Sequence, residues 1–340
     1  MDLQNRKELK ATARQRLDGC RNAARISLIY AVITVGASLL LNLVKLFLNS
    51  QISQTGGLQN LGLRSVLSTL DTMLPLVLNF LLMCVGLGFT GAMLRVSRGQ
   101  FASPNSLRVG FERFWVLLRA VLLQGGFYIL ACMAGYIISM QIFFLTPMSR
   151  KLLAVMAPVM SSSSGDVMAI LENPAVMEQL AGSMFPLYLM MGLITLAICA
   201  PIYYRFILVK YLIIDRPGTG ALMALRDSRV LMRGNGTKFF KLDLSLWYYY
   251  LASFLSLLIS FGAPILSLLG VPLPGSPVVI SFVFLLVSLV VSFLTTLFLR
   301  PHMEVTHALA YASLLHREQP SGGVVLGNIC DLAKDQYKNM

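Results

Sequence analysis

The sequence predicts an all-α, polytopic membrane protein with six transmembrane helices and both termini in the cytoplasm. Three observations predict it: an apolar composition, six long apolar runs and an alternating distribution of basic residues. Of the 340 residues, 56% are hydrophobic and 13% are charged, and the mean hydropathy is +0.72. Soluble domains are about half apolar and about a quarter charged, so this composition is typical of a membrane protein.

Six apolar runs are long enough to cross a bilayer, which needs roughly 20 mostly apolar residues. The backbone in lipid must satisfy its hydrogen bonds within the segment, so runs of this length predict helices. The third and fourth runs exceed that length, so tilt, kinks or extension beyond the bilayer are expected. The runs cover 26–48, 73–94, 115–145, 185–213, 247–270 and 278–299, which together make a membrane domain over residues 26–299.

Lysine and arginine alternate between many and few in the segments that separate these runs. From the N-terminus, the segments hold seven, one, four, two, six, none and four basic residues. The positive-inside rule places the basic-rich segments in the cytoplasm. An even number of spans with both termini cytoplasmic follows, because an odd number would destroy the alternation.

Three segments lie outside the runs. Residues 1–25 are expected to be a basic cytoplasmic segment, because the run that follows is too long for a secretory signal and lacks a small-residue cleavage pattern. Residues 146–184 are expected to be a long external segment, with "MSSSSGD" between two short Met-rich helical pieces. It either lies at the interface, which we favour, or caps an external cavity. Residues 300–340 are expected to be a cytoplasmic helix and tail.

Several kinds of function are not indicated by the sequence. The formal charge is +13, but the basic residues flank apolar runs, so the partner they predict is an anionic inner leaflet and not nucleic acid. No Asp or Glu lies within the six runs, whereas ion-driven carriers need an intramembrane carboxylate or an equivalent relay. The five cysteines have no CxxC or metal-ligand spacing and predict no disulfide framework; they are Cys20, Cys84, Cys132, Cys199 and Cys330.

The densest basic stretch lies between the fourth and fifth runs. "GTGALMALRDSRVLMRGNG" predicts a short amphipathic helix that ends at Gly234 or Gly236. At 100° per residue, Arg226, Arg229 and Arg233 fall within a 60° stripe, and small and apolar residues cover another side. Such a helix either lies along anionic headgroups, with Lys238 and Lys241 beside it, or packs on the cytosolic ends of the spans with its arginines solvated.

Two cations follow a proline in the fourth run. Pro201 is expected to kink or end that span near Tyr203. Arg205 and Lys210 then lie at the cytoplasmic interface, on a helix that continues to Asp215. The alternative is an interior anion site that contains Arg205 and Lys210. Two glycine-rich stretches, "GLGFTGA" from Gly86 and "GGFYILACMAG" from Gly125, predict close packing between helices.

Enzymatic chemistry has one candidate segment, "RPHMEVTHALAYASLLH", with His302, Glu304 and His307. Metalloprotease helices carry two histidines four residues apart, with a glutamate beside the first. Here the two histidines are five residues apart, which separates them on a helix. We therefore expect no enzymatic activity, no metal and no cofactor, with a metal-dependent membrane enzyme as an alternative.

The stretches "NRKELKATARQRL", "MLRVSRGQFASPNSLRVGFERF" and "YYRFILVKYLIIDRPGTGALMALRDSRVLMRGNGTKFFKLDLSLW" resemble an uncharacterised bacterial membrane family known as domain of unknown function 975. The resemblance covers most of residues 5–316 and implies a polytopic plasma-membrane protein of a bacterium, without an activity. "RPHMEVTHALAYASLL" is similar to the closing segment of the family, although His302 and Met303 stand where an aromatic is expected. The family pattern falls on Tyr204, Asp215, Pro217, Ser228, Arg229, Met232, Gly234, Phe240 and Leu242.

The sequence therefore predicts a non-enzymatic integral membrane protein that binds anionic lipid or a membrane partner through its basic cytoplasmic face. A second copy of the chain is a further candidate for that partner. The alternative function is a transporter or exporter subunit with an anion-handling site near Arg205 and Lys210.

Overall fold

The described part of the computed structural model is mainly helical, and no strand occurs in it. The structure describes residues 5–54, 61–147, 149–150, 153–154, 157, 174–262, 266 and 277–317. Most of the predicted external segment 146–184, the loop before Pro277 and the tail after Arg317 lie outside the described residues. The chain divides into two compact units, one made of residues 1–117 and 208–340 and the other of residues 118–207.

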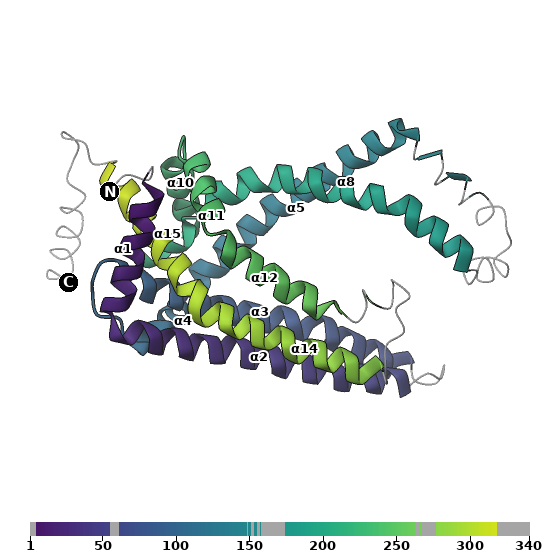
Figure 1. The fold of residues 1–340 in the computed structure, drawn as a ribbon, viewed down its shortest axis with the longest axis horizontal. Coiled ribbons are helices and arrows are strands. Elements are labelled where there is room, and N and C mark those ends of the chain that lie inside the picture. Colours follow the sequence, from purple (N-terminus) through teal and green to yellow (C-terminus); the bar gives the residue numbers. More distant parts are fainter. Residues whose placement is uncertain are drawn as a thin grey trace. The chain divides into compact units, whose positions relative to one another are not determined.

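The first unit contains most of the helices shown in Figure 1. They are α1 (Arg6–Gly19), α2 (Arg21–Gln54), α3 (Leu61–Ser97), the 3₁₀ helix η2 (Pro104–Arg108), α4 (Val109–Glu112), α9 (Val209–Asp215), α10 (Ala221–Leu231), α11 (Gly236–Ser245), α12 (Trp247–Ser260), α14 (Pro277–Leu294), the π-helix η3 (Thr295–Leu299) and α15 (Arg300–Arg317). The second unit contains α8 (Pro174–Phe206) and most of α5 (Phe114–Leu145).

Five helical segments are long and apolar enough to cross a membrane, and a sixth is added if α11 and α12 form one broken span. This confirms an all-helical fold with five or six candidate membrane spans in the described part of the chain. The five segments are Asn22–Leu48, Ser65–Ser97, Phe114–Leu145, Pro186–Asp215 and Val279–Leu315.

The apolar surfaces of these segments are mostly exposed in the isolated chain. Between 17% and 22% of each hydrophobic window is buried inside the protein. A soluble monomer rarely exposes a contiguous apolar patch of more than a few hundred Å². The exposed apolar surface of these segments is therefore suited to contact with lipid.

In the first unit, α2 packs along α3, and α12 packs along α14. Figure 1 shows α1 running across the end of this bundle at which α2 begins. Two cations of α1 hold it there: Arg6 donates to the carbonyl of Lys241 at 3.3 Å, and Lys10 donates to the carbonyl of Ser245 at 3.2 Å. Both acceptors are in the last turns of α11, where unsatisfied carbonyls and the helix dipole attract positive charge.

Glycines allow backbone-to-backbone packing in the first unit. A Cβ at Gly88 of α3 would lie 2.2 Å from the carbonyl oxygen of Leu107, and one at Gly110 of α4 would lie 1.8 Å from that of Cys84. The predicted close packing is thus present at Gly88, where the partner is the loop helix η2. At Gly91 of the same stretch, an added Cβ would lie 3.3 Å from the side chain of Ile214, which belongs to the candidate span Pro186–Asp215.

In the second unit, α5 and α8 meet at a glycine. A Cβ at Gly135 would lie 2.6 Å from Oγ1 of Thr195, whereas Gly125 and Gly126 have no such neighbour within 4 Å. The packing predicted for this stretch therefore occurs at one end of it. Pro201 lies inside α8, which continues to Phe206 before it ends. The chain then re-enters a helix, α9, which ends at Asp215 as predicted.

Candidate functional site

The C-terminal helix α15 carries a polar stripe that is turned into the first unit. Arg300, Glu304, His307 and Tyr311 follow the spacing i, i+4, i+7 and i+11, which places them on one helical face. The candidate span from Val279 to Leu315 has 37 residues, about 55 Å of α-helix, whereas the hydrocarbon core of a bilayer is about 30 Å thick. The segment is therefore longer than the hydrocarbon core is thick.

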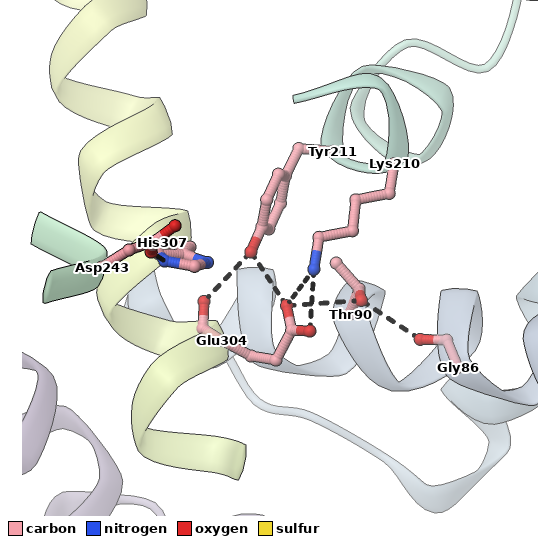
Figure 2. A network of polar contacts seen from close by, with 7 residues as sticks. All are labelled: Gly86, Thr90, Lys210, Tyr211, Asp243, Glu304 and His307. Atoms are coloured by element: carbon pink, nitrogen blue, oxygen red, sulfur yellow. Dashed lines mark hydrogen bonds and ion pairs between the residues drawn. The ribbon is translucent and has the colours of Figure 1, made fainter. Parts of the chain in front are cut away.

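Glu304 is the centre of a buried polar cluster (Figure 2). Its side chain is 3% exposed, and Lys210 Nζ lies 2.8 Å from each of its carboxylate oxygens. Tyr211 donates its hydroxyl to Oε2 at 2.9 Å, and Thr90 lies at 3.5 Å from the same oxygen. The carboxylate therefore ties together α3, α9 and α15, three helices that are distant in the sequence.

The two histidines of the segment have partners of their own. His307 Nε2 lies 2.6 Å from Asp243 Oδ1 of α11, and both side chains are buried. His302 Nδ1 lies 3.0 Å from the hydroxyl of Tyr248 on α12. The three candidate residues of the metal-enzyme alternative thus face three different partners, and no cluster of three or more metal-binding side chains occurs in the described part of the chain.

A second polar junction joins α3, α9 and α15. Asp215 accepts hydrogen bonds from Arg98 at 2.7 Å and from the Tyr311 hydroxyl at 3.0 Å. The hydrogen bond to Asp215 raises the pKa of the Arg98 guanidinium, so this cation stays charged at physiological pH. Tyr311 also stacks on Tyr211, which connects this junction to the Glu304 cluster.

Arg300 supplies a second cation near Glu304. Its guanidinium lies 4.8 Å from the ring centroid of Tyr30, which in turn stacks on Phe89. Its electrostatic interactions include both Tyr30 and Glu304. The packed end of the bundle therefore holds the two cations Lys210 and Arg300 around one buried carboxylate.

Most of this network is not evident from the sequence. Tyr211 and Thr90 lie in or beside apolar runs, Asp243 follows the basic stretch, and Thr90 is 214 residues away from Glu304. The periodic polar stripe of α15 was visible and would have indicated one buried polar face. Lys210, predicted as an interfacial residue or an anion ligand, is paired with Glu304, whereas Arg205 belongs to the other compact unit.

Residues Ala221–Leu231 of the basic stretch form the helix α10. Its small and apolar side is buried in the first unit, including Ala224 and Leu225, while Arg226, Arg229 and Arg233 are exposed. Gly234 has a φ of +75°, a left-handed conformation that suits glycine, and the chain turns there into α11. Of the two lysines of this stretch, Lys241 is exposed and Lys238 is half-buried.

One comparison with known proteins gives a match. The family described as "Protein of unknown function (DUF975)" matches residues 1–318 of the chain. The chain belongs to this family. The DUF975 match runs from the first residue to just beyond the end of α15, so it includes both compact units and confirms the resemblance seen in the sequence. No curated protein and no solved structure shows significant similarity to the chain.

Most of the residues on which the DUF975 resemblance was based lie between the end of α9 and α11. Asp215 holds Arg98 and Tyr311, and the carbonyl of Pro217 accepts a hydrogen bond from Arg113. Ser228 is fully buried in α10, and Gly234 makes the turn that follows it. Tyr204 lies in α8, in the other unit.

Proposed function

We propose that this DUF975 protein is a non-enzymatic protein of the bacterial plasma membrane that binds anionic lipid of the inner leaflet through α10 and α11. Both termini are on the cytoplasmic side in this proposal, and the basic face of the two helices lies at the membrane surface. The observation that carries it is the make-up of the exposed side of these helices, which combines cations with large apolar side chains.

The exposed side of α10 is not merely cationic. Leu222 and Met223 are 70% and 62% exposed and lie beside the arginines, as does Val230. On α11 and at the start of α12, Phe240, Leu244 and Trp247 are also exposed, next to Lys241. Solvated cytosolic helices favour polar residues on the free side, whereas interfacial helices place apolar and aromatic side chains among Lys and Arg.

The opposite sides of the two helices are held by the protein. In α10 the buried residues include Ala221 and Leu231, and in α11 they include Phe239 and Leu242. The helix α11 is bent by 67° from α12. If α12 crosses the bilayer, α11 is inclined steeply toward the membrane plane, so its exposed side faces the headgroup region.

The anion-site alternative has less support. The ammonium group of Lys210 already lies 2.8 Å from both oxygens of the Glu304 carboxylate, and a charge neutralised in this way is a weak ligand for a second anion. A protein partner at the exposed side of α10 and α11 is an outcome that the following experiment distinguishes.

The chain offers an internal reporter for lipid at this surface. It has two tryptophans, Trp115 and Trp247, so Trp115→Phe leaves a single tryptophan at the start of α12. Brominated phosphatidylglycerol should quench Trp247 more strongly than brominated phosphatidylcholine at equal mole fraction in mixed micelles. Salt should reduce the difference, because screening lengths fall from about 10 Å at 0.1 M to about 3 Å at 1 M.

Substitutions in the arginine stripe test the preference for phosphatidylglycerol over phosphatidylcholine. Replacing Arg226, Arg229 and Arg233 with glutamine should lower the preference for phosphatidylglycerol at least tenfold, since each cation near an anionic surface contributes about 1 kcal/mol. The matched control replaces the same three residues with lysine, which keeps the charge and should keep the preference. A glutamine variant with unchanged preference would contradict the proposal, and quenching by neither lipid would favour a protein partner.

A further inference from the structure

A groove lies in the first unit where α1 turns into α2. It has a volume of about 540 Å³ and is lined by α1, the first turns of α2, the start of α12 and the junction of η3 with α15. Small-molecule sites in proteins have volumes of roughly 300–1,000 Å³. None of the residues of the basic face on α10 and α11 lines it, so it is a separate feature of the molecule.

One wall of the groove carries an opposite pair of charges. Arg14 and Asp18 are both exposed and lie four residues apart on α1. Neither forms an ion pair with any other residue that the structure describes. The order of arginine before an acidic residue is the less favourable one for a pair on a helix, so both charges are available to a ligand.

The floor and back of the groove are fixed by hydrogen bonds. The ring of His302 lies within hydrogen-bond distance of the hydroxyl of Tyr248, with 3.0 Å between Nδ1 and the hydroxyl oxygen. Ala23 and Ala24 of α2 line this part of the groove, and the N–H of Ala23 is already bonded to the carbonyl of Cys20. Arg14 is therefore the group that makes one end of the groove suitable for an anion.

The other wall is apolar and includes the π-helix. Leu297 and Phe298 of η3 line the groove, and Phe298 is 66% exposed. π-helices are rare and frequently occur at functional sites. Because η3 continues directly from α14, a helix whose surface suits lipid, this wall extends the groove toward hydrocarbon.

We propose that this groove binds one phospholipid whose headgroup carries a phosphate and a primary amine. The phosphate lies against Arg14, the ammonium group lies against Asp18, and the acyl chains lie along Leu297 and Phe298. Arg14 and Asp18 are separated by about one helical turn, 5.4 Å. The two-carbon linker of an ethanolamine headgroup separates its two charges by a similar distance.

Native mass spectrometry of the full-length, delipidated protein tests this assignment. Phosphatidylethanolamine, phosphatidylglycerol and phosphatidylcholine of the same acyl chains are added separately, and one-to-one adducts are titrated. Arg14→Gln should weaken the adducts of all three lipids about tenfold, the usual size of a lost charge-assisted hydrogen bond. Asp18→Asn should weaken phosphatidylethanolamine about tenfold and leave phosphatidylglycerol unchanged or tighter.

Matched controls separate a site from general charge effects. Lys7→Gln and Glu112→Gln change exposed charges outside the groove and should leave every adduct unchanged. The triple glutamine variant of α10 should also keep the phosphatidylethanolamine adduct, so this test can fail or succeed independently of the proposed function. Glycerophosphoethanolamine, which has no acyl chains, should bind at least tenfold more weakly than the lipid.

Three results would overturn the proposal. If both Arg14→Gln and Asp18→Asn bound phosphatidylethanolamine with wild-type affinity, the proposed site would be disproved. If Asp18→Asn lost phosphatidylethanolamine and phosphatidylglycerol equally, the contact between Asp18 and the amine would be disproved. Binding of glycerophosphoethanolamine as tight as that of the lipid would assign the groove to a soluble phosphate ester instead.

Discussion

Replacing Lys210 with methionine is expected to destabilise the first unit by about 2–3 kcal/mol, although the side-chain volume hardly changes. Removing one partner of a buried ion pair costs about 3–5 kcal/mol, because the remaining charge stays buried without compensation. Glu304 is 3% exposed, but Lys210 is 32% exposed, so solvent already screens part of the interaction and the expected loss lies at or below the lower end of that range. Denaturant or thermal unfolding of the purified protein in a mild detergent measures the loss.

A double-mutant cycle shows whether the pair itself carries this loss. In Lys210→Met combined with Glu304→Gln, the buried charge is removed with its partner, so the double variant should be more stable than Lys210→Met alone. Arg216 and Asp227 are the matched surface pair, 3.0 Å apart with side chains 35% and 31% exposed. Arg216→Met should cost less than about 1 kcal/mol. Equal effects of Lys210→Met and Arg216→Met would contradict a structural role for the Glu304 cluster.

The spans were predictable because their determinant is local. An apolar run of sufficient length is a helix in lipid whatever it packs against, and the five runs that can be compared occur as helices. The predicted limits were narrower at 73–94, where the helix extends from Leu61 to Ser97. Hydropathy detects the part of a helix that lies in hydrocarbon, whereas polar turns that continue the same helix into water or headgroups have no apolar pattern.

The polar interior of the first unit was not predictable in the same way. Lys210 and Glu304 are 94 residues apart, and nothing in the sequence around either residue specifies the other. Composition correctly indicated that the six runs lack carboxylates, but it could not show that one just beyond them, Glu304, would be buried. The periodicity of α15 identifies a polar face, and only the packing of α3, α9 and α11 identifies the partners of that face.

The surface of the basic helix α10 was also predictable only in part from the sequence. Periodicity separated the arginine stripe of α10 from its apolar face, and the structure places that apolar face against protein. The two alternatives considered from the sequence were therefore not exclusive, because Leu222, Met223 and Val230 provide a second apolar set beside the arginines. Dividing an amphipathic helix into one polar and one apolar face does not predict a surface on which exposed apolar side chains lie among cations.

Gly110→Ala is expected to destabilise the first unit by about 3 kcal/mol, the upper end of the usual range for overpacking. A Cβ at this position would lie 1.8 Å from the carbonyl oxygen of Cys84 and 3.1 Å from the backbone nitrogen of Gly88. These atoms belong to the backbone of α3, which cannot move aside as a flexible side chain can. The substitution therefore has to displace α4 and η2 from α3.

The control for this clash lies on α3 itself. At Gly86 the nearest atom to an added Cβ is the Tyr30 hydroxyl at 3.6 Å, an ordinary contact distance. Gly86→Ala should be neutral or stabilising by up to about 1 kcal/mol, because alanine favours a helix over glycine. Unfolding in the same detergent compares the two variants, with Gly88→Ala expected to behave like Gly110→Ala because it meets the backbone of Leu107. If Gly110→Ala were as stable as Gly86→Ala, the backbone contact between α3 and α4 would be disproved, since no rearrangement of side chains alone relieves it.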